Sequence, residues 1–100
     1  MPAGRKKRLE WALPALDEFE TGLAYIAQDN PAAARLIQSR IEKAGEIVVA
    51  NPGIGTPGFA PDTRHYSIAR TRYTLIYEES ADAVLILHCW HQSRDAPAKD

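Results

Sequence analysis

A polar cluster follows the most apolar run of the chain, close to its C-terminal end. The run from Leu85 to Trp90 is too apolar to lie open to water, so we expect a buried strand there. Imidazole titrates near neutrality and guanidinium binds phosphate oxygens in pairs, so His91 can act as base or acid with Arg94 as an anion clamp. Polar residues at a strand end also commonly satisfy backbone groups and fasten the following segment. The first interpretation places chemistry or binding at this rim of the sheet, whereas the second gives these residues a structural role.

The same region contains three residue types that bind metals, namely His88, Cys89 and His91. On a strand, His88 points to one face while Cys89 and His91 point to the other. A zinc site needs four convergent ligands, and the chain has no second cysteine. We therefore expect neither a metal nor another cofactor.

Three arginines, Arg64, Arg70 and Arg72, flank the first hairpin of the expected sheet. They can form a basic rim for an acidic protein segment or for nucleic acid, or they can be solvated turn residues. Tyr73 and Tyr77 share one face of the expected strand over residues 73–78. Such positions are more typical of core packing than of a stacking platform.

These residues need elements to position them, and the first half of the chain predicts a short strand and two helices. Leu9 and Trp11 alternate with charged residues, as in a strand with one buried face. Apolar residues then recur at helical spacing from Pro14 to Ile26 and again from Ile37 to Val48. Between them, Asn30 can cap the second helix and Pro31 suits its first turn.

The second half predicts a sheet. Residues 51–62 are so rich in glycine and proline that we expect no regular structure there. Residues 63–69, 73–78 and 83–90 read as three strands joined by short turns. The prediction is an α+β fold in the order β-α-α-β-β-β, with a helical hairpin packed on one face of a small, mainly antiparallel sheet. The opposite face or an edge would remain for a partner.

Length and composition limit the classes of function. One hundred residues predict a single domain, 1–100, with residues 1–7 as a flexible start. Twelve basic and thirteen acidic residues give a formal net charge of −1, so the chain as a whole has no electrostatic preference for polyanions. The lone Cys89 is typical of a reducing cytoplasm, and no apolar stretch is long enough to predict a membrane span.

Several segments together resemble toxins of bacterial type II toxin–antitoxin modules, and the closer match is to the ParE branch of the ParE/RelE superfamily, which includes plasmid stabilisation proteins. The resemblance runs from residue 11 to residue 97 and rests on Tyr25–Ala27, Asn30–Ala34, Asn51–Gly55, Thr63–Arg64, Tyr73–Tyr77, Val84–Leu87 and His91–Pro97. Two positions depart from the family pattern, since Asp62 and His65 stand where relatives often have Gly and Glu.

The resemblance implies the RelE/ParE toxin fold and two alternative activities. RelE-type toxins cleave messenger RNA on the ribosome, which for this chain would use His91, Arg94, Arg64 and Tyr73. RelE-type sequences carry an arginine directly after the tyrosine that matches Tyr73, and this chain has Thr74 there. The ParE branch lacks such a catalytic set and is associated with inhibition of DNA gyrase.

The leading hypothesis is therefore a ParE-like toxin of the bacterial cytoplasm, neutralised by a cognate antitoxin and directed at DNA gyrase. Its expected partner-binding residues are Arg64, Arg70, Arg72, Tyr73, His91 and Arg94. The alternatives are a RelE-like ribonuclease and a degenerate, non-toxic protein that binds an antitoxin. A hollow of phosphate size that gathers the histidine and two basic groups would favour the ribonuclease.

Overall fold

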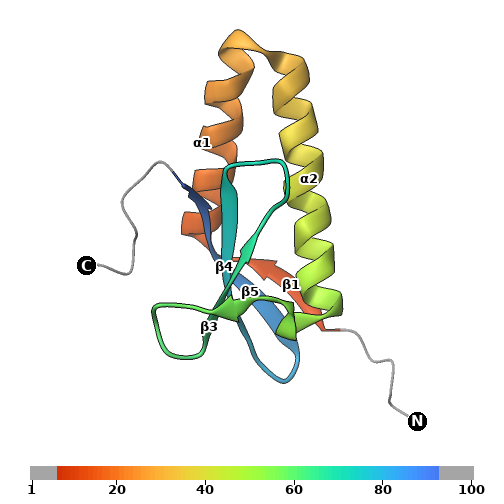
Figure 1. The fold of residues 1–100 in the computed structure, drawn as a ribbon, viewed down its shortest axis with the longest axis vertical. Helices are drawn as coiled ribbons and strands as arrows, with labels where there is room; N and C mark the ends of the chain where they lie inside the picture. The colour runs from red at the N-terminus through yellow and green to blue at the C-terminus, as the bar shows by residue number, and fades with distance from the viewer. Residues whose placement is uncertain (1–6, 93–100) are drawn as a thin grey trace.

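Two long antiparallel helices stand over one face of a five-stranded sheet (Figure 1). The structure is a computed structural model, and it describes residues 7–92. Its elements in chain order are β1 (Arg8–Trp11), α1 (Leu13–Asp29), α2 (Pro31–Ala50), the 3-10 helix η1 (Pro52–Ile54), β2 (Thr56–Pro57), β3 (Thr63–Ser67), β4 (Tyr73–Glu79) and β5 (Ala83–His91). The predicted α+β fold, with a helical hairpin on a mainly antiparallel sheet, is confirmed.

The two helices begin where the sequence signals predicted. Each has a proline in its first turn, where the missing N–H is not needed. The Asn30 side chain accepts a hydrogen bond from the Ala33 N–H at 3.0 Å and so caps α2. Because Asn30 alone separates the two helices, they fold back on each other as a hairpin.

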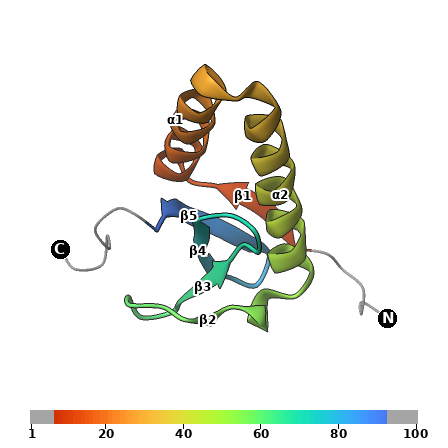
Figure 2. The ribbon, with the colours of Figure 1, turned by 45° about the horizontal axis from the view of Figure 1, so that its top comes forward.

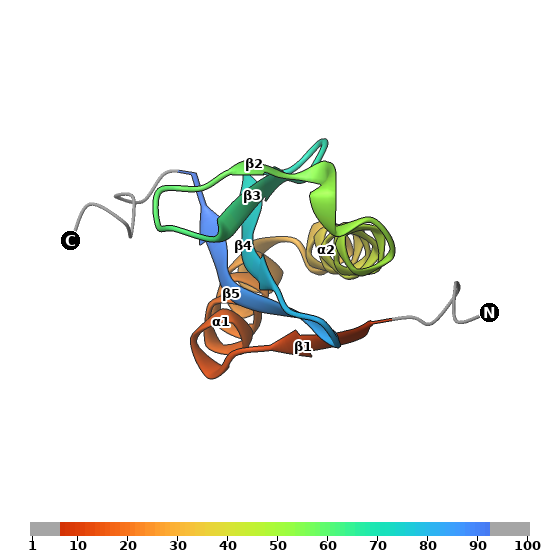
Figure 3. The ribbon, with the colours of Figure 1, turned by 90° about the horizontal axis from the view of Figure 1, so that it is seen from below.

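The strands are arranged in the order β1-β5-β4-β3-β2 (Figures 2 and 3). Strand β1 lies parallel to β5, with Arg8 opposite Ala83 and Trp11 opposite Ile86. The other neighbouring strands are antiparallel. Trp11 also stacks on Phe19 at a ring-centroid distance of 5.4 Å, which fastens the start of α1 to the edge of the sheet.

The expectation that residues 51–62 have no regular structure is wrong in two places. Pro52–Ile54 forms the 3-10 helix, and Thr56–Pro57 forms the edge strand β2 opposite His65 and Arg64. Glycine and proline exclude a long element, but a proline fits an edge strand whose outer side needs no donor. The sheet therefore has five strands instead of the four predicted.

The predicted strand over residues 63–69 is two residues too long. It ends at Ser67, because the Ile68 carbonyl accepts the Thr71 N–H at 3.2 Å and so begins the turn. Strands β4 and β5 each extend one residue further than predicted. A bulge between Ile76 and Tyr77, where the pairing shifts from His88 to Ile86, leaves Leu87 unpaired and bends β5.

The core lies between the hairpin and the sheet. Its largest fully buried side chains are Tyr77, Ile41, Leu75, Ile86, Val48, Val84 and Cys89. On the far face of β4, Thr74 and Ile76 are only 8% and 7% exposed. The middle of β4 is therefore covered on both faces.

Two sequence expectations fall at the ends of the chain. Residues 1–7 were expected to be flexible, and all but Lys7 lie outside the described residues. The Lys7 ammonium donates to the carbonyls of Ser80 and Ala81 at 2.6 and 2.9 Å. Arg94 and the rest of residues 93–100 also lie outside the described part. Within that part, neither helix combines the length and the apolar character needed to cross a membrane.

Candidate functional site

Two adjoining hollows lie between the helical hairpin and the turn that joins β3 to β4. The first, of about 570 Å³, is lined by Ile26, Ile37, Arg70, Thr71, Arg72, Tyr73, His91 and Gln92. The second, of about 280 Å³, is lined by Arg40, Lys43, Ala44, Ile47, Tyr66, Ile68, Ala69 and Arg70. Arg70 borders both hollows, and the two together are called here the basic groove.

A tightly bonded turn forms one wall of the basic groove. The Thr71 hydroxyl donates to the Ile68 carbonyl at 2.9 Å and accepts from the Tyr73 N–H at 3.0 Å. Arg70 has a positive φ of 64°, which reverses the chain at that point. The Gln92 N–H donates to the Arg72 carbonyl at 2.8 Å, which ties the turn to the end of β5. The backbone that carries Arg70 and Arg72 is therefore held on both sides.

Helix α2 supplies the opposite wall and further positive charge. Arg40 donates to the Arg70 carbonyl at 3.1 Å, so the turn is fixed against the helix (Figure 1). Arg40, Lys43 and Ile47 lie on one flank of α2, at spacings of three and four residues. The helical period of α2 alone predicts Arg40 and Lys43 on its outward side, and the packing of the turn brings both into the groove.

Tyr73 and His91 stand side by side at the end of the groove that is nearest to α1. They are opposite each other in β4 and β5, and their rings meet edge to face at 5.0 Å. Tyr73 is only 5% exposed, and its hydroxyl comes so close to α1 that a Cβ on Gly22 would overlap it. Tyr73 is thus a packing residue under the rim, as its place beside Leu75 predicted.

Glu18 on α1 is a further residue whose role the sequence alone does not predict. Its carboxylate accepts the Cys89 N–H at 2.9 Å and lies 3.2 Å from Nδ1 of His88. The sequence signal for this contact was weak, because an acidic residue near a helix start is common for reasons of the helix dipole alone. In the structure Glu18 lies beyond the first turn of α1 and faces β5.

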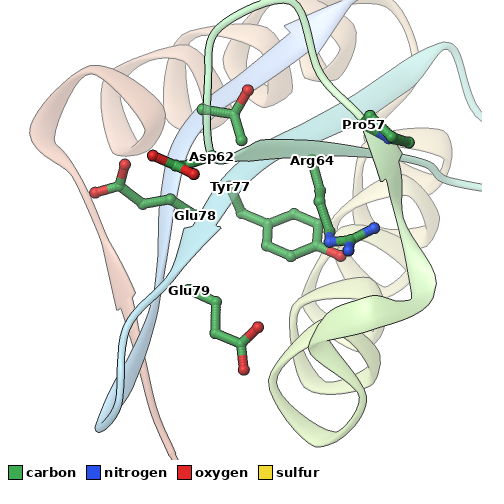
Figure 4. A pocket seen from close by; sticks show the side chains of 7 residues that line it. Pro57, Asp62, Arg64, Tyr77, Glu78 and Glu79 are labelled. Carbon is green, nitrogen blue, oxygen red and sulfur yellow. The ribbon is translucent and has the colours of Figure 1, made fainter.

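Arg64 lies elsewhere, in a separate hollow of about 600 Å³ at the far end of β3 (Figure 4). Its guanidinium donates to the Gly55 carbonyl at 2.7 Å and points toward the Tyr77 hydroxyl. Burial raises the pKa of Tyr77, while the Gly55 N–H and the Arg64 charge act in the opposite direction. The same hollow is lined by Asp62, Glu78 and Glu79, so its charge is predominantly acidic.

The two positions that depart from the family pattern also lie at this end of the sheet. His65 packs edge to face with Phe59 at 5.0 Å, and burial lowers its pKa. Asp62 adopts a positive φ of 65° in the turn before β3. Neither residue borders the basic groove.

The structure therefore separates the predicted site residues into two groups. One hollow is lined by Arg70, Arg72, Tyr73 and His91. Arg64 lies opposite Tyr77, which is four residues from Tyr73 along β4, and four strand residues span about 13 Å. Of the four residues assigned to a ribonuclease, Tyr73 and His91 lie together and Arg64 is remote from them, while Arg94 lies outside the described residues. His91 does share its hollow with two arginines, the arrangement named above as favouring the ribonuclease.

Among residues 7–92, no three histidine, cysteine or acidic side chains are grouped as a metal site would require. His88 and His91 are paired with Ile76 and Tyr73, on opposite faces of β4. The side chains that line the basic groove are mainly cationic, aromatic and aliphatic.

Comparison with known proteins identifies a family, a similar toxin and a solved structure of the same fold. The family model of the ParE toxin of the type II toxin-antitoxin system, parDE, matches residues 9–96. A Sinorhizobium fredii protein with the name "Putative toxin Y4kP" is 35% identical over 92 residues, which are 92% of this chain and 95% of that protein. A solved structure, "Chromosomal ParDE TA system from P. aeruginosa", superposes with a TM-score of 0.78.

That structural match covers 88% of this chain and 98% of the other at 19% sequence identity, so it supports the fold. The family match spans both helices and all five strands. The chain belongs to the ParE toxin family of type II toxin–antitoxin systems.

Proposed function

We propose that this ParE-family toxin inhibits DNA gyrase in the bacterial cytoplasm and is held inactive by a cognate antitoxin whose acidic segment occupies the basic groove. The observation that supports the antitoxin part most directly is the gathering of Arg40, Lys43, Arg70 and Arg72 around two adjoining hollows in a protein of net charge −1. Such a local field selects an acidic partner without attracting polyanions to the whole surface.

The groove suits an amphipathic segment because its cations surround apolar side chains. Ile26 and Ile37 come from the two helices, and Ile47 continues the apolar surface along α2. A disordered antitoxin segment that folds on binding can bury its apolar residues there and place its carboxylates against the rim.

Binding is favoured over bond cleavage by the state of the candidate catalytic residues. Tyr73 is 5% exposed and packed against Gly22, so its hydroxyl is a poor proton donor to a large substrate. Thr74, which replaces the RelE-type arginine, is 8% exposed and points to the opposite face from Tyr73. Arg64 is committed to the Gly55 carbonyl in the other hollow.

Regulated expression in bacteria, combined with a supercoiling assay on purified protein, tests the proposal. Expression is expected to arrest growth with signs of DNA damage, and the purified toxin is expected to inhibit supercoiling by gyrase. Co-expression of the cognate antitoxin is expected to restore growth. Arrest without any effect on gyrase at saturating toxin would reject the target. No arrest at all would instead support the non-toxic, antitoxin-binding alternative.

A ribosome-dependent ribonuclease is the second candidate, and one observation favours it: His91, Arg70 and Arg72 line the same hollow. If the protein cleaves ribosome-bound message, H91A and the double variant R70A/R72A should each abolish cleavage, while R35A on the exposed side of α2 should not. Intact message at high toxin concentration would discard this function.

A further inference from the structure

The edge of β5 is covered by β1 for only part of its length. Register pairs run from Arg8 opposite Ala83 to Trp11 opposite Ile86, and the last backbone bond on this side is from the Ala12 N–H to the Ile86 carbonyl at 2.8 Å. Strand β5 then continues to His91, beyond the reach of β1. Beyond that bond, this stretch of the edge is supported by another element, because α1 packs against β5 and Cys89 is fully buried there.

Glu18 on α1 provides that support. Its Oε1 accepts the Cys89 N–H at 2.9 Å, a bond that a neighbouring strand would otherwise make. A hydrogen bond to a carboxylate is roughly twice as strong as one between neutral groups. Both carboxylate oxygens also lie 3.2 to 3.3 Å from Nδ1 of His88. One side chain of a helix thus holds two successive residues of the strand.

Three residues on the same stripe of α1 meet the ends of β4 and β5. Glu18, Gly22 and Ile26 are four residues apart and therefore face the same way. Glu18 bonds Cys89, Gly22 accommodates the Tyr73 hydroxyl, and Ile26 lines the basic groove. The position of α1 along β5 consequently sets how Ile26 stands relative to Tyr73 and His91.

We propose that Glu18 is the positioning residue of the basic groove: its carboxylate bonds the edge of β5 beyond the stretch that β1 pairs with and so holds His91 against Tyr73. Glu18 does not line the groove itself, and it acts through the strand. This inference rests on the proposed function of the groove as the antitoxin site. It predicts that losing the acceptor oxygen of residue 18 impairs binding at a distance, without removing any contact to the partner.

Amide exchange and proton NMR on the full chain test the structural step. In E18A, the Cys89 amide is expected to exchange at least about tenfold faster, and the nuclear Overhauser effect between the His91 and Tyr73 rings is expected to weaken. In E18Q, whose amide oxygen can still accept the Cys89 N–H, both signals should stay close to wild type. E20A, which removes an exposed acid from the same helix, should change neither.

A second measurement keeps the test decisive if E18A does not fold. In the wild-type protein, the Cys89 amide should be protected to a degree comparable with the amides that pair β4 with β5. A fast-exchanging Cys89 amide in the wild type would overturn the inference. So would an E18A protein that keeps both the protection of Cys89 and the contact between the rings.

The functional step is tested by titrating the purified cognate antitoxin into each variant. E18A is expected to bind about tenfold more weakly, and E18Q to recover the affinity. V49A, a core truncation on α2 away from the groove, is a control of lowered stability that should bind normally. Equal losses in E18A and V49A would overturn the positioning role. If the wild type itself does not bind antitoxin, the proposed function fails, while the exchange data still decide whether Glu18 holds β5.

Discussion

At the scale of single residues, Tyr77 joins the sheet to the segment that follows α2. Its side chain is fully buried, and its hydroxyl accepts the Gly55 N–H at 3.0 Å and donates to the Pro52 carbonyl at 2.6 Å. A backbone segment rich in glycine and proline has few bonds of its own, so these two contacts determine where η1 and β2 lie. Arg64, bonded to the Gly55 carbonyl, completes the arrangement.

Replacing Tyr77 by phenylalanine should lower the free energy of unfolding by about 1–3 kcal/mol, because a buried N–H and a carbonyl lose their partner. Urea denaturation monitored by circular dichroism measures this change. Y25F is the matched control, since Tyr25 is 73% exposed, and its effect should stay within about 0.5 kcal/mol. Equal stabilities of Y77F and Y25F would show that the hydroxyl does not hold the loop.

The burial of His65 is expected to make the free energy of unfolding depend on pH. Burial lowers its pKa from the ordinary 6.5, so the unfolded chain takes up a proton more readily than the folded one. The stabilising contribution of neutral His65 is complete above the pKa of His65 in the unfolded chain. It is lost as the pH falls through the pKa of His65 in the folded protein. Between about pH 7 and about pH 5, the wild type should therefore lose stability more steeply than H65Q. Parallel profiles of the two proteins would contradict this assignment.

At the scale of elements, the approach of α1 to β4 depends on Gly22. Glycine inside a helix is usually unfavourable, and alanine would normally stabilise α1 by up to about 1 kcal/mol. Here a Cβ would overlap the Tyr73 hydroxyl, so α1 can lie this close to the sheet only with glycine at that position.

G22A should therefore lower the free energy of unfolding by about 1–2 kcal/mol, because the overlap outweighs the gain in helix propensity. The double variant G22A/Y73F removes the overlapping hydroxyl, and it should be more stable than the sum of the two single effects implies. Thermal denaturation of the four proteins measures the coupling. G53A is the control, since a Cβ there meets no atom within 4 Å. A stabilising G22A would refute the packing argument.

The elements differ in how far local sequence determines them. The hairpin could be predicted because Asn30 and Pro31 form a start signal and the apolar residues keep a helical period. Strand β2 could not, because two residues at a sheet edge have no period. The parallel pairing of Arg8–Trp11 with the start of β5 also joins residues from opposite ends of the sequence, which local patterns do not encode.

The sequence predicts part of the candidate site. Arg70, Arg72, Tyr73 and His91 were predicted as partner-binding residues, and they line one hollow; their role in binding stays a prediction. Arg64 was grouped with them by residue type, but the length of β3 places it at the other end of the sheet. Arg40, Lys43 and Glu18 were missed because only the tertiary packing shows which neighbours their flanks meet.

At the scale of the whole molecule, charge is divided between two ends of the sheet. The basic groove collects Arg40, Lys43, Arg70 and Arg72, while the hollow around Arg64 is bordered by Asp62, Glu78 and Glu79. The formal net charge of −1 conceals this division. An acidic segment is therefore guided to one end and repelled from the other, with an effect that falls as salt screens the charges.

The most direct test of the basic groove as the antitoxin site is calorimetric titration of the cognate antitoxin into two double variants, R70E/R72E and R8E/R35E. Both double variants change the net charge by the same amount, and Arg8 and Arg35 lie outside the basic groove. R70E/R72E should bind at least about tenfold more weakly, because carboxylates would then face carboxylates, whereas R8E/R35E should bind as the wild type does. Equal affinities of the two variants would contradict the assignment of the groove as the antitoxin site.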